Sequence, residues 1–247
     1  MNETIALINR RRSIRKYKPD PIPEEMLAAI IGCAQRAPTS SNMQAWSVVA
    51  VTDPDMKKRL AVLSGNQAYV AECPVFLVWC ADLCRLKTAC DLEGGPEGGM
   101  PSNAELFIIA TVDAALAAQN AVIAAESLGL GTVYIGGIRN NPQEVAELLE
   151  LPELVYPVFG MCLGFPAEQP DLRPRLPMRA VLHRNRYSRE THADSIEAYN
   201  RELRHYMLTR TGSRRDTTWS KEMVRRLGSN LRPHMKAFLQ SRGFRLD

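Results

Sequence analysis

Residues 104–137 read AELFIIATVDAALAAQNAVIAAESLGLGTVYIGG, and this stretch decides the fold. Apolar side chains lie on nearly every side of residues 104–128, which predicts a long helix covered on both faces. Gly129 is typical of the position just beyond a helix end. Residues 132–135 then predict a buried strand, which is followed by the pair Gly136 and Gly137. A long core helix that leads into a strand is therefore the centre of the predicted fold.

The remaining segments add helices and strands without strict alternation. Residues 23–37 predict a helix, because a proline precedes one stripe of apolar residues. A second, short helix is predicted to begin with a capping-box-like sequence at Asn141 and to end near Leu149. Continuous apolar runs rich in β-branched or aromatic residues predict further buried strands at 46–52, 75–81 and 158–163. Four or five strands around a long helix indicate an α+β fold.

Two stretches lie outside this core pattern. Residues 82–103 contain the glycine pairs Gly94-Gly95 and Gly98-Gly99 and no phosphate-loop motif, so we expect either a mobile surface loop or a lid. From about residue 184 the sequence is polar, arginine-rich and helical in pattern. The chain is thus predicted to be one domain, residues 1–247, with a basic helical C-terminal extension.

Composition indicates a cytoplasmic protein. Of 247 residues, 45% are hydrophobic and 23% charged, which is typical of soluble globular chains. The most apolar run, residues 106–128, is interrupted by Asp113, Gln119 and Asn120, so we interpret it as a buried helix and expect no membrane partner. The N-terminal residues lack the features of a secretory signal. Six cysteines without a regular spacing indicate reduced thiols, and scattered histidines argue against a metal site.

Charge is distributed unevenly along the chain. Residues 183–247 carry 15 Lys and Arg against 7 Asp and Glu, a net +8, whereas residues 1–182 carry −4. Such an asymmetry indicates an anionic partner or an acidic surface of the chain itself. A nucleic-acid partner is not expected, because the arginines of residues 210–232 lack interleaved aromatic side chains apart from Trp219.

Several short polar clusters can hold a ligand. In Arg11-Arg12-Ser13-Ile14-Arg15 three guanidinium groups and a hydroxyl can donate to one phosphate, although a solvated basic turn has the same composition. The segment PTSSNMQ, residues 38–44, can line the edge of a heterocycle or form an ordinary turn. Further clusters are GNQAY (65–69), YIGG (134–137) and DLRPRLP (171–177).

Well-known catalytic motifs are not found in the sequence. The glycines from Gly129 to Gly137 run from a helix to a strand, whereas a dinucleotide-binding turn runs from a strand to a helix. The sequence contains neither a GxSxG nucleophile elbow nor an HExxH metal site. If the chain is a redox enzyme, its electrons must pass through a cofactor that is held in another way.

Taken together, the clusters resemble one known family. RRSIRKY, PTSSNMQAW, GNQAYV, AQNAVIAAESLGLGTVYIGGIRNN, FGMCLGFP with DLRPRLP, and RRDTTWS occur in the same order as in the FMN-dependent nitroreductase superfamily. They resemble most closely the branch of oxygen-insensitive NADPH nitroreductases and NADPH–flavin oxidoreductases. The resemblance covers essentially the whole chain.

The resemblance implies a nitroreductase-like sandwich, with a central, mostly antiparallel sheet flanked by helices, that forms an intertwined homodimer. It also implies an FMN site at the dimer interface, with Arg15 as the residue that tunes the flavin and no strict protein acid or base. The residues implied to bind FMN are Arg11, Arg12, Ser13, Arg15, Thr39, Ser40, Gln67, Tyr69, Tyr134, Ile135, Gly136, Gly137, Arg173 and Arg175.

The implied activity is ping-pong transfer of a hydride from NADPH or NADH to FMN, and then to nitroaromatics, quinones or similar acceptors. Arg210, Arg214 and Arg215 are implied to recognise the NADPH phosphate. Two alternatives stay open at this stage: an NAD(P)H–flavin reductase that supplies free reduced flavin, and a non-catalytic FMN-binding redox sensor.

Overall fold

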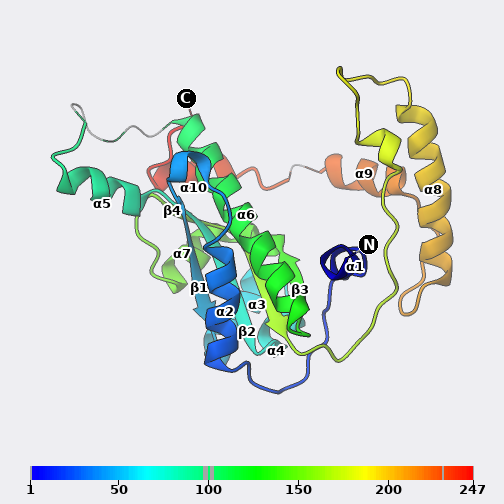
Figure 1. Cartoon of the computed structure of the whole chain (residues 1–247), viewed down its shortest axis with the longest axis horizontal. Coiled ribbons are helices and arrows are strands. Elements are labelled where there is room, and N and C mark those ends of the chain that lie inside the picture. Colours follow the sequence, from blue (N-terminus) through cyan, green and yellow to red (C-terminus); the bar gives the residue numbers. More distant parts are fainter. Residues whose placement is uncertain (1, 97–99, 101–102, 230, 247) are drawn as a thin grey trace. The chain divides into compact units, whose positions relative to one another are not determined.

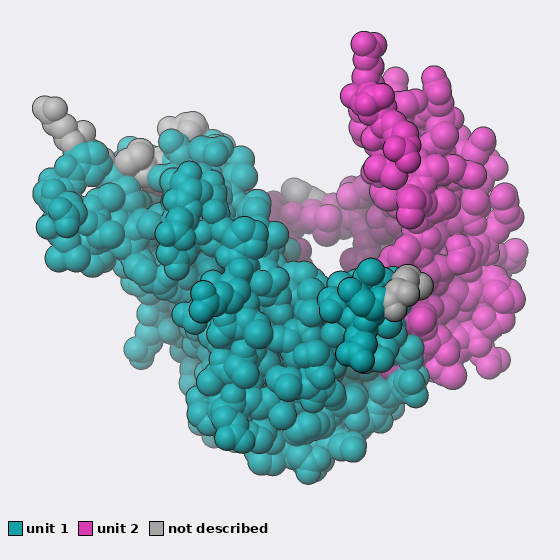
Figure 2. All heavy atoms as spheres, in the orientation of Figure 1, with its two compact units in different colours: residues 1–169, 234–247 teal, residues 170–233 magenta. Residues whose placement is uncertain are grey.

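The computed structural model describes residues 2–96, 100, 103–229 and 231–246 (Figure 1). The chain divides into two compact units, which Figure 2 shows in different colours. Unit 1 comprises residues 1–169 and 234–247, and unit 2 comprises residues 170–233. The expected single domain with a basic extension from about residue 184 stays a prediction, and the last residues of the chain belong to unit 1.

Unit 1 is built on one antiparallel sheet in the order β1-β2-β4-β3. The four strands among the described residues are β1 (Trp46–Val51), β2 (Val75–Asp82), β3 (Gly131–Ile135) and β4 (Val155–Gly164). All four were predicted, and β4 extends beyond the apolar run that predicted it. Strands and helices share one unit, which confirms the α+β class.

Alternate side chains of β2 pack on opposite faces of the sheet. Leu77 and Trp79 point to the face covered by α2 (Glu24–Ala34) and α6 (Ala104–Ser127). Phe76 and Val78 point to the other face, in one core cluster with residues of three shorter helices. These are α3 (Pro54–Leu63), α4 (Ala68–Glu72) and α7 (Pro142–Leu148). The continuous apolar run of β2 thus reflects burial on both faces.

The remaining helices are divided between unit 1 and unit 2. Unit 1 also contains α1 (Glu3–Asn9), η1 (Ser40–Asn42), α5 (Cys84–Leu92), η2 (Gly136–Asn140) and α10 (Met235–Ser241). Unit 2 contains η3 (Met178–Ala180), α8 (His192–Thr209) and α9 (Trp219–Leu227). Tyr199, Leu203 and Met207 of α8 form its core.

Two local predictions were wrong. Residues 82–103 were predicted to be a loop, but they include α5, which is supported by an ion pair of 2.6 Å between Lys87 and Asp91. Residues 97–99 and 101–102 of the predicted lid lie outside the described residues. The helix α7 begins after Asn141 as predicted, but that residue does not cap it. Its amide instead donates to the Leu63 carbonyl at 2.8 Å.

The prediction that α6 is covered on both faces was also wrong for the single chain. Ile108, Val112 and Leu116 are 52%, 48% and 40% exposed. Their spacing of four residues places them on one stripe of the helix. The buried side instead carries Ala110, Ala114, Ala117, Ala118, Ala121 and Val122. The helix therefore presents an apolar stripe that the described residues of unit 1 leave uncovered.

Among the described residues, α6 is the one helix whose length and apolar character would allow it to cross a membrane. It packs, however, on α2 and on the sheet, in a cluster of thirteen buried residues. Core helices of soluble proteins have the same length and composition. Its contacts with the sheet account for the apolar composition of this helix.

Candidate functional site

The N-terminal segment RRSIRKY lies along the start of β3. Ser13 forms a parallel bridge with Thr132, and the Ile14 N–H donates to the Thr132 carbonyl at 3.0 Å. The Ile14 side chain is buried against Gly131, where an added Cβ would approach Ile14 atoms to 2.7–2.9 Å. Glycine at position 131 thus lets the basic segment reach the strand.

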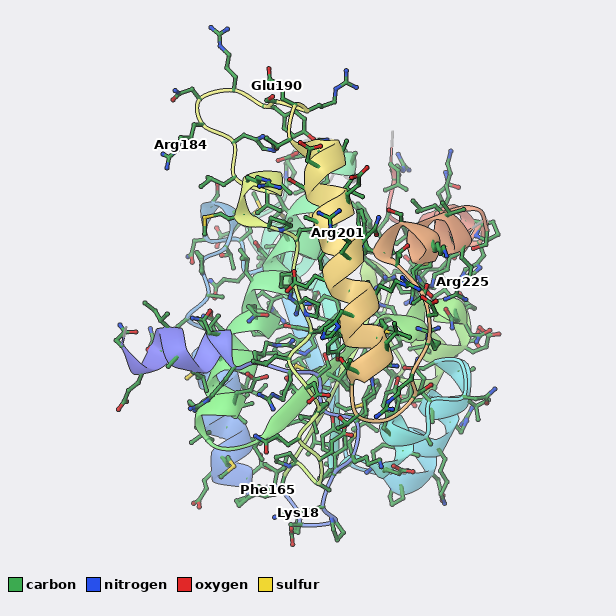
Figure 3. The ribbon with its side chains drawn as sticks, turned by 90° about the vertical axis from the view of Figure 1, so that its right-hand side faces the viewer. Lys18, Phe165, Arg184, Glu190, Arg201 and Arg225 are labelled. Carbon is green, nitrogen blue, oxygen red and sulfur yellow. The ribbon has the colours of Figure 1, made fainter. Side chains whose placement is uncertain are left out.

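The other end of the same segment is fastened to the residues that follow β4. The Lys18 N–H donates to the Phe165 carbonyl at 2.9 Å, and Figure 3 shows these two residues side by side. The Glu168 carboxylate accepts from the backbone N–H groups of Arg15 and Lys16 at 2.5 and 3.1 Å. This carboxylate, which was not predicted, orients the backbone at Arg15.

Glu126 is a second acidic residue that sequence reasoning missed. The Arg11 Nε lies 3.6 Å from its carboxylate, which also accepts from the Thr132 hydroxyl at 3.2 Å. Burial raises the pKa of Glu126, and the charge of Arg11 opposes that effect. The Arg11 Nε is buried without a hydrogen-bond partner in the described part of the chain. It is therefore a buried donor available to an anion.

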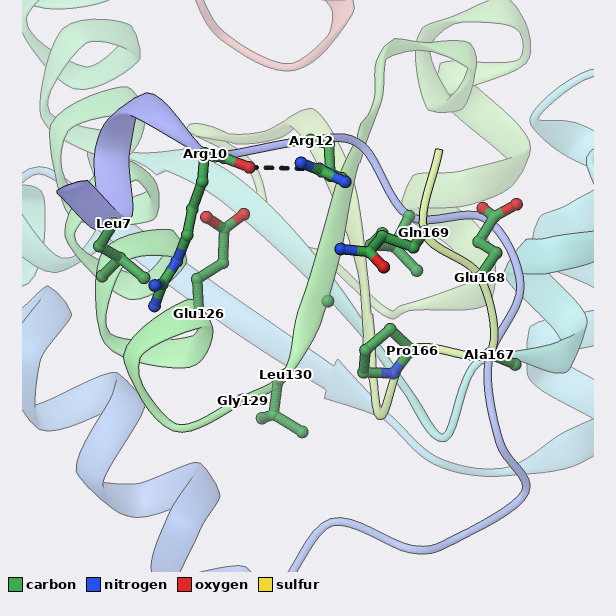
Figure 4. Close-up of a pocket in the computed structure, with 12 residues that line it drawn as sticks. Leu7, Arg10, Arg12, Glu126, Gly129, Leu130, Pro166, Ala167, Glu168 and Gln169 are labelled. Atoms are coloured by element: carbon green, nitrogen blue, oxygen red, sulfur yellow. Dashed lines mark hydrogen bonds between the residues drawn. The ribbon is translucent and has the colours of Figure 1, made fainter. Parts of the chain in front are cut away.

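A pocket of about 590 Å³ lies beside this segment (Figure 4). Arg10, Arg12 and Ile14 line it, whereas Ser13 and Arg15 do not. The Arg12 Nε donates to the Arg10 carbonyl at 3.3 Å, shown as the dashed line in Figure 4. The four residues predicted to hold one phosphate therefore do not all line the same hollow.

The clusters GNQAY and YIGG meet beyond the end of β3. A Cβ added at Gly137 would lie 2.2 Å from the Ser64 carbonyl oxygen and 2.4 Å from Gln67 Nε2. Gln67 Nε2 donates to the Ser64 carbonyl at 2.5 Å, and the Tyr69 hydroxyl donates to Gln67 Oε1. Glycine at 137 is thus required by the close approach of two backbones. We call residues 11–17, 65–69 and 131–137 the β3 cradle.

Tyr134 lies in the middle of this cradle. Its ring packs edge-on against Phe159, with centroids 5.0 Å apart, and its hydroxyl lies 3.4 Å from Gln119 Oε1. Burial raises the pKa of Tyr134 to about 12, so the phenol is neutral at physiological pH. Ile135 points the opposite way, into the core beneath α3, α4 and α7.

Residues 38–45, which we call the α6 loop, are held by a carboxylate of α6. Asp113, which is 1% exposed, accepts from the N–H groups of Ser40 and Ala45. The Gln44 N–H donates to the Thr39 hydroxyl at 3.2 Å. Thr39 and Ser40, both predicted site residues, therefore belong to a loop whose geometry depends on α6.

The register of the sheet separates the α6 loop from the β3 cradle. The loop leads into Trp46, which is paired through Ala81 with Tyr156 at one end of the sheet. Thr132, which holds Ser13, is paired with Leu163 at the other end. Tyr156 and Leu163 are about 23 Å apart along β4. Ile135, at the far end of β3, is paired with Gly160, so YIGG lies nearer to the Tyr156 end than Ser13 does. One chain thus carries the α6 loop beside the edge strand β1 and the cradle along the opposite edge strand β3.

Unit 2 contains the remaining predicted site residues. Arg173 and Arg175 lie in the extended stretch before η3. Arg210 donates twice to the Ser213 carbonyl, at 2.8 and 2.5 Å, and Arg215 lies 3.7 Å from Glu222. Arg214 is exposed and has no hydrogen bond or ion pair within the described residues. Of the three arginines, Arg214 is therefore the one whose guanidinium is available.

The chain is similar to known proteins over nearly its whole length. The model of the Nitroreductase family matches residues 8–165, and the model of its C-terminal domain matches residues 173–247. The oxygen-insensitive NADPH nitroreductase of Salmonella typhimurium is 41% identical over 99% of both chains. The structure of NfrA2 from B. megaterium superposes with a TM-score of 0.96, at 40% identity and full coverage of both chains. The NADPH:FMN oxidoreductase of Vibrio harveyi, solved in complex with NAD+, gives 0.88 at 41% identity and 98% coverage of both.

Proposed function

The chain belongs to the nitroreductase family, and from that premise we propose that it binds FMN and uses NADPH or NADH to reduce nitroaromatics, quinones or flavins. The names of its relatives support both flavin and nitro compounds as acceptors. The observation that carries the proposal is the meeting of three sequence-distant clusters, RRSIR, GNQAY and YIGG, along a single strand and its continuation.

The residues of the β3 cradle fit FMN. Arg11 supplies a buried guanidinium nitrogen that has no hydrogen-bond partner among the described residues and lies 3.6 Å from Glu126, which suits a phosphate dianion. The close approach at Gly137 holds the GNQAY segment against the end of β3, so that Gln67 lies beside the YIGG backbone. Hydroxyl and amide groups of Ser13 and Gln67 add donors and acceptors at either side.

Bound FMN would supply the hydride-accepting and electron-donating chemistry. The residues of the chain would hold and tune the cofactor. The guanidinium of Arg15, whose backbone Glu168 orients, would stabilise negative charge that develops on the ring. No side chain needs to donate or remove a proton, so we expect no single substitution of an acid or base to abolish turnover.

We propose that the site is completed by a second copy of the chain. The β3 cradle follows one edge strand of the sheet and the α6 loop adjoins the opposite edge strand, which favours a ring site that takes its two parts from different chains. The exposed stripe of Ile108, Val112 and Leu116 on α6 is a surface that a second copy would bury.

The NADPH phosphate is proposed to bind Arg214. Arg210 and Arg215 are already engaged with Ser213 and Glu222, whereas Arg214 is exposed and free among the described residues. We expect Arg214→Ala to raise the KM for NADPH and to leave the KM for NADH unchanged. An equal effect on the two nucleotides would reject this assignment. A cytoplasmic location remains a prediction, which the six free cysteines support.

Steady-state kinetics of the purified protein test the proposal. We expect yellow protein with flavin absorbance, and parallel double-reciprocal lines when NADPH is varied against nitrofurazone, a quinone or free FMN. A higher kcat/KM for free FMN would identify a flavin reductase. Flavin-containing protein without turnover of any acceptor would indicate a redox sensor. Colourless protein that cannot be reconstituted with FMN would overturn the proposal.

A further inference from the structure

Asp113 is a buried carboxylate that the proposed chemistry does not use. It lies near the middle of α6 on a buried side that is mostly alanine, and it is 1% exposed. Its Oδ1 accepts from the Ser40 N–H at 3.2 Å, and its Oδ2 accepts from the Ala45 N–H at 3.1 Å. Both oxygens therefore serve the backbone of the α6 loop, one near each end.

The α6 loop needs such support because its backbone is strained. Ser41, Asn42 and Gln44 have φ values of 47°, 57° and 52°, in the left-handed region that is unfavourable for residues other than glycine. Three such residues within four positions do not persist unless surrounding contacts hold them. The Gln44 carbonyl accepts from Arg85 at 3.3 Å, but this contact holds only the end of the loop and not its start at Thr39 and Ser40.

We infer that Asp113 is a positioning residue for the cofactor edge: it holds the backbone of the α6 loop so that Thr39 and Ser40 face the flavin ring. The inference rests on the proposed function, because it assigns a purpose to a loop that the proposal places at the cofactor. Asp113 acts through the loop backbone and does not itself touch the cofactor.

The chemistry of a carboxylate explains why aspartate suits this position. Two oxygens can each accept an N–H from a different part of the loop. Asparagine has nearly the same shape but one acceptor, so its NH₂ group would face one of the two N–H donors. A buried donor facing a donor is unfavourable, and the loop is then expected to leave its strained conformation.

The test measures FMN affinity and loop protection in the full-length protein. We expect Asp113→Asn to raise the FMN dissociation constant, measured by quenching of flavin fluorescence, about tenfold. Hydrogen exchange, followed by mass spectrometry, should accelerate in peptides covering residues 39–45. Asp113→Glu retains both acceptor oxygens, so it should lose less affinity than Asp113→Asn, and it carries the test if the asparagine variant does not fold.

Thr111→Val is the matched control. Thr111 lies two residues earlier on α6 and bonds to the Tyr156 hydroxyl at 2.7 Å, and among the described residues it has no hydrogen bond to the α6 loop. This variant should lower Tm while leaving FMN affinity and exchange at 39–45 unchanged. An Asp113→Asn protein with wild-type FMN affinity, or with wild-type exchange in the loop, would overturn the inference. Wild-type protein that does not bind FMN would instead overturn the proposed function.

Discussion

The two ends of the sheet in unit 1 are built in different ways. At the β3 cradle, segments far apart in the sequence meet: Ser13 bridges Thr132, and Tyr17 bridges Pro166. At the α6 loop, one short segment of strained backbone is held by a single buried carboxylate, Asp113. Both therefore rely on hydrogen bonds, and the cradle depends in addition on close approaches at Gly131 and Gly137.

This contrast teaches how one cofactor site can be divided between copies of a chain. Neither the β3 cradle nor the α6 loop alone offers both a phosphate-binding cluster and residues on both sides of a ring. A second copy that packs on α6 can bring the α6 loop of one chain to the β3 cradle of the other. The uncovered stripe of α6 and the separated half-sites are then two consequences of the same arrangement.

The largest expected effect comes from a charge on the uncovered stripe. Val112→Glu would bury an unpaired carboxylate in each copy of the proposed interface, which is strongly unfavourable. We expect the variant to be a monomer by light scattering. It should also lose its FMN, because the β3 cradle of one chain no longer meets the α6 loop of another.

Val62→Glu is the control, because Val62 is 61% exposed on α3, which lies on the other face of the sheet. It should remain a dimer with bound FMN. A Val112→Glu protein that stays dimeric and yellow would show that the exposed stripe of α6 is needed neither for the dimer nor for FMN binding.

A methyl group at Gly137 tests the cradle. Gly137→Ala would force the new Cβ against the Ser64 carbonyl oxygen, so we expect a loss of about 1–3 kcal/mol in the free energy of unfolding. Gly136→Ala is the matched control, since its Cβ would meet only the Arg139 guanidinium at an ordinary 3.6 Å. Urea denaturation measures the free energy of unfolding of both variants. Equal values for the two would show that the fold does not require the close approach at Gly137.

The arginines of the cradle should differ in their contribution to FMN binding. Removing a charge-assisted hydrogen bond by Arg15→Ala should weaken FMN binding about 10- to 100-fold. Arg12→Ala should have a smaller effect, because Arg12 lines the neighbouring pocket with Arg10. Fluorescence titration measures both dissociation constants. Unchanged affinity and an unchanged rate of flavin reduction in Arg15→Ala would exclude the role given to Arg15.

The smallest effect is expected from Glu126, whose pKa is raised mainly by burial. A raised pKa means that its stabilising contribution is complete in acid and is lost as pH rises through the folded-state pKa. Glu126→Gln should therefore raise Tm slightly at pH 7, and this gain should disappear near pH 4. Thermal unfolding at both pH values measures it, and a Tm below wild type at pH 7 would show that the ion pair with Arg11 dominates.

Much of the fold was predictable because its elements have strong local patterns. The apolar runs of β1, β2, β3 and β4 and the long pattern of α6 predicted elements that the structure confirms. The helix α5 was not predicted, because the glycine pairs that follow it in the same stretch indicated a loop. The cap at Asn141 was missed because a tertiary contact with Leu63 competes for its side chain.

The polar clusters of the candidate site could be predicted from the sequence, but the acidic residues that hold these clusters in place could not. The polar clusters were visible as short runs, and two of them do meet at Gly137. Glu126, Glu168 and Asp113 were missed because each serves a segment distant in sequence. Asp113 did carry a signal: an acidic residue within an apolar, buried helix requires donors from elsewhere in the fold.

The central claim is that the β3 cradle of one chain and the α6 loop of another form one site. Co-expression of Arg15→Ala and Asp113→Asn subunits with different tags, followed by purification of the hybrid, tests it most directly. If the site is shared, one site of the hybrid receives both substitutions and the other receives neither. FMN titration should then show one wild-type-affinity site for every two chains. A hybrid without any wild-type-affinity site would contradict the account.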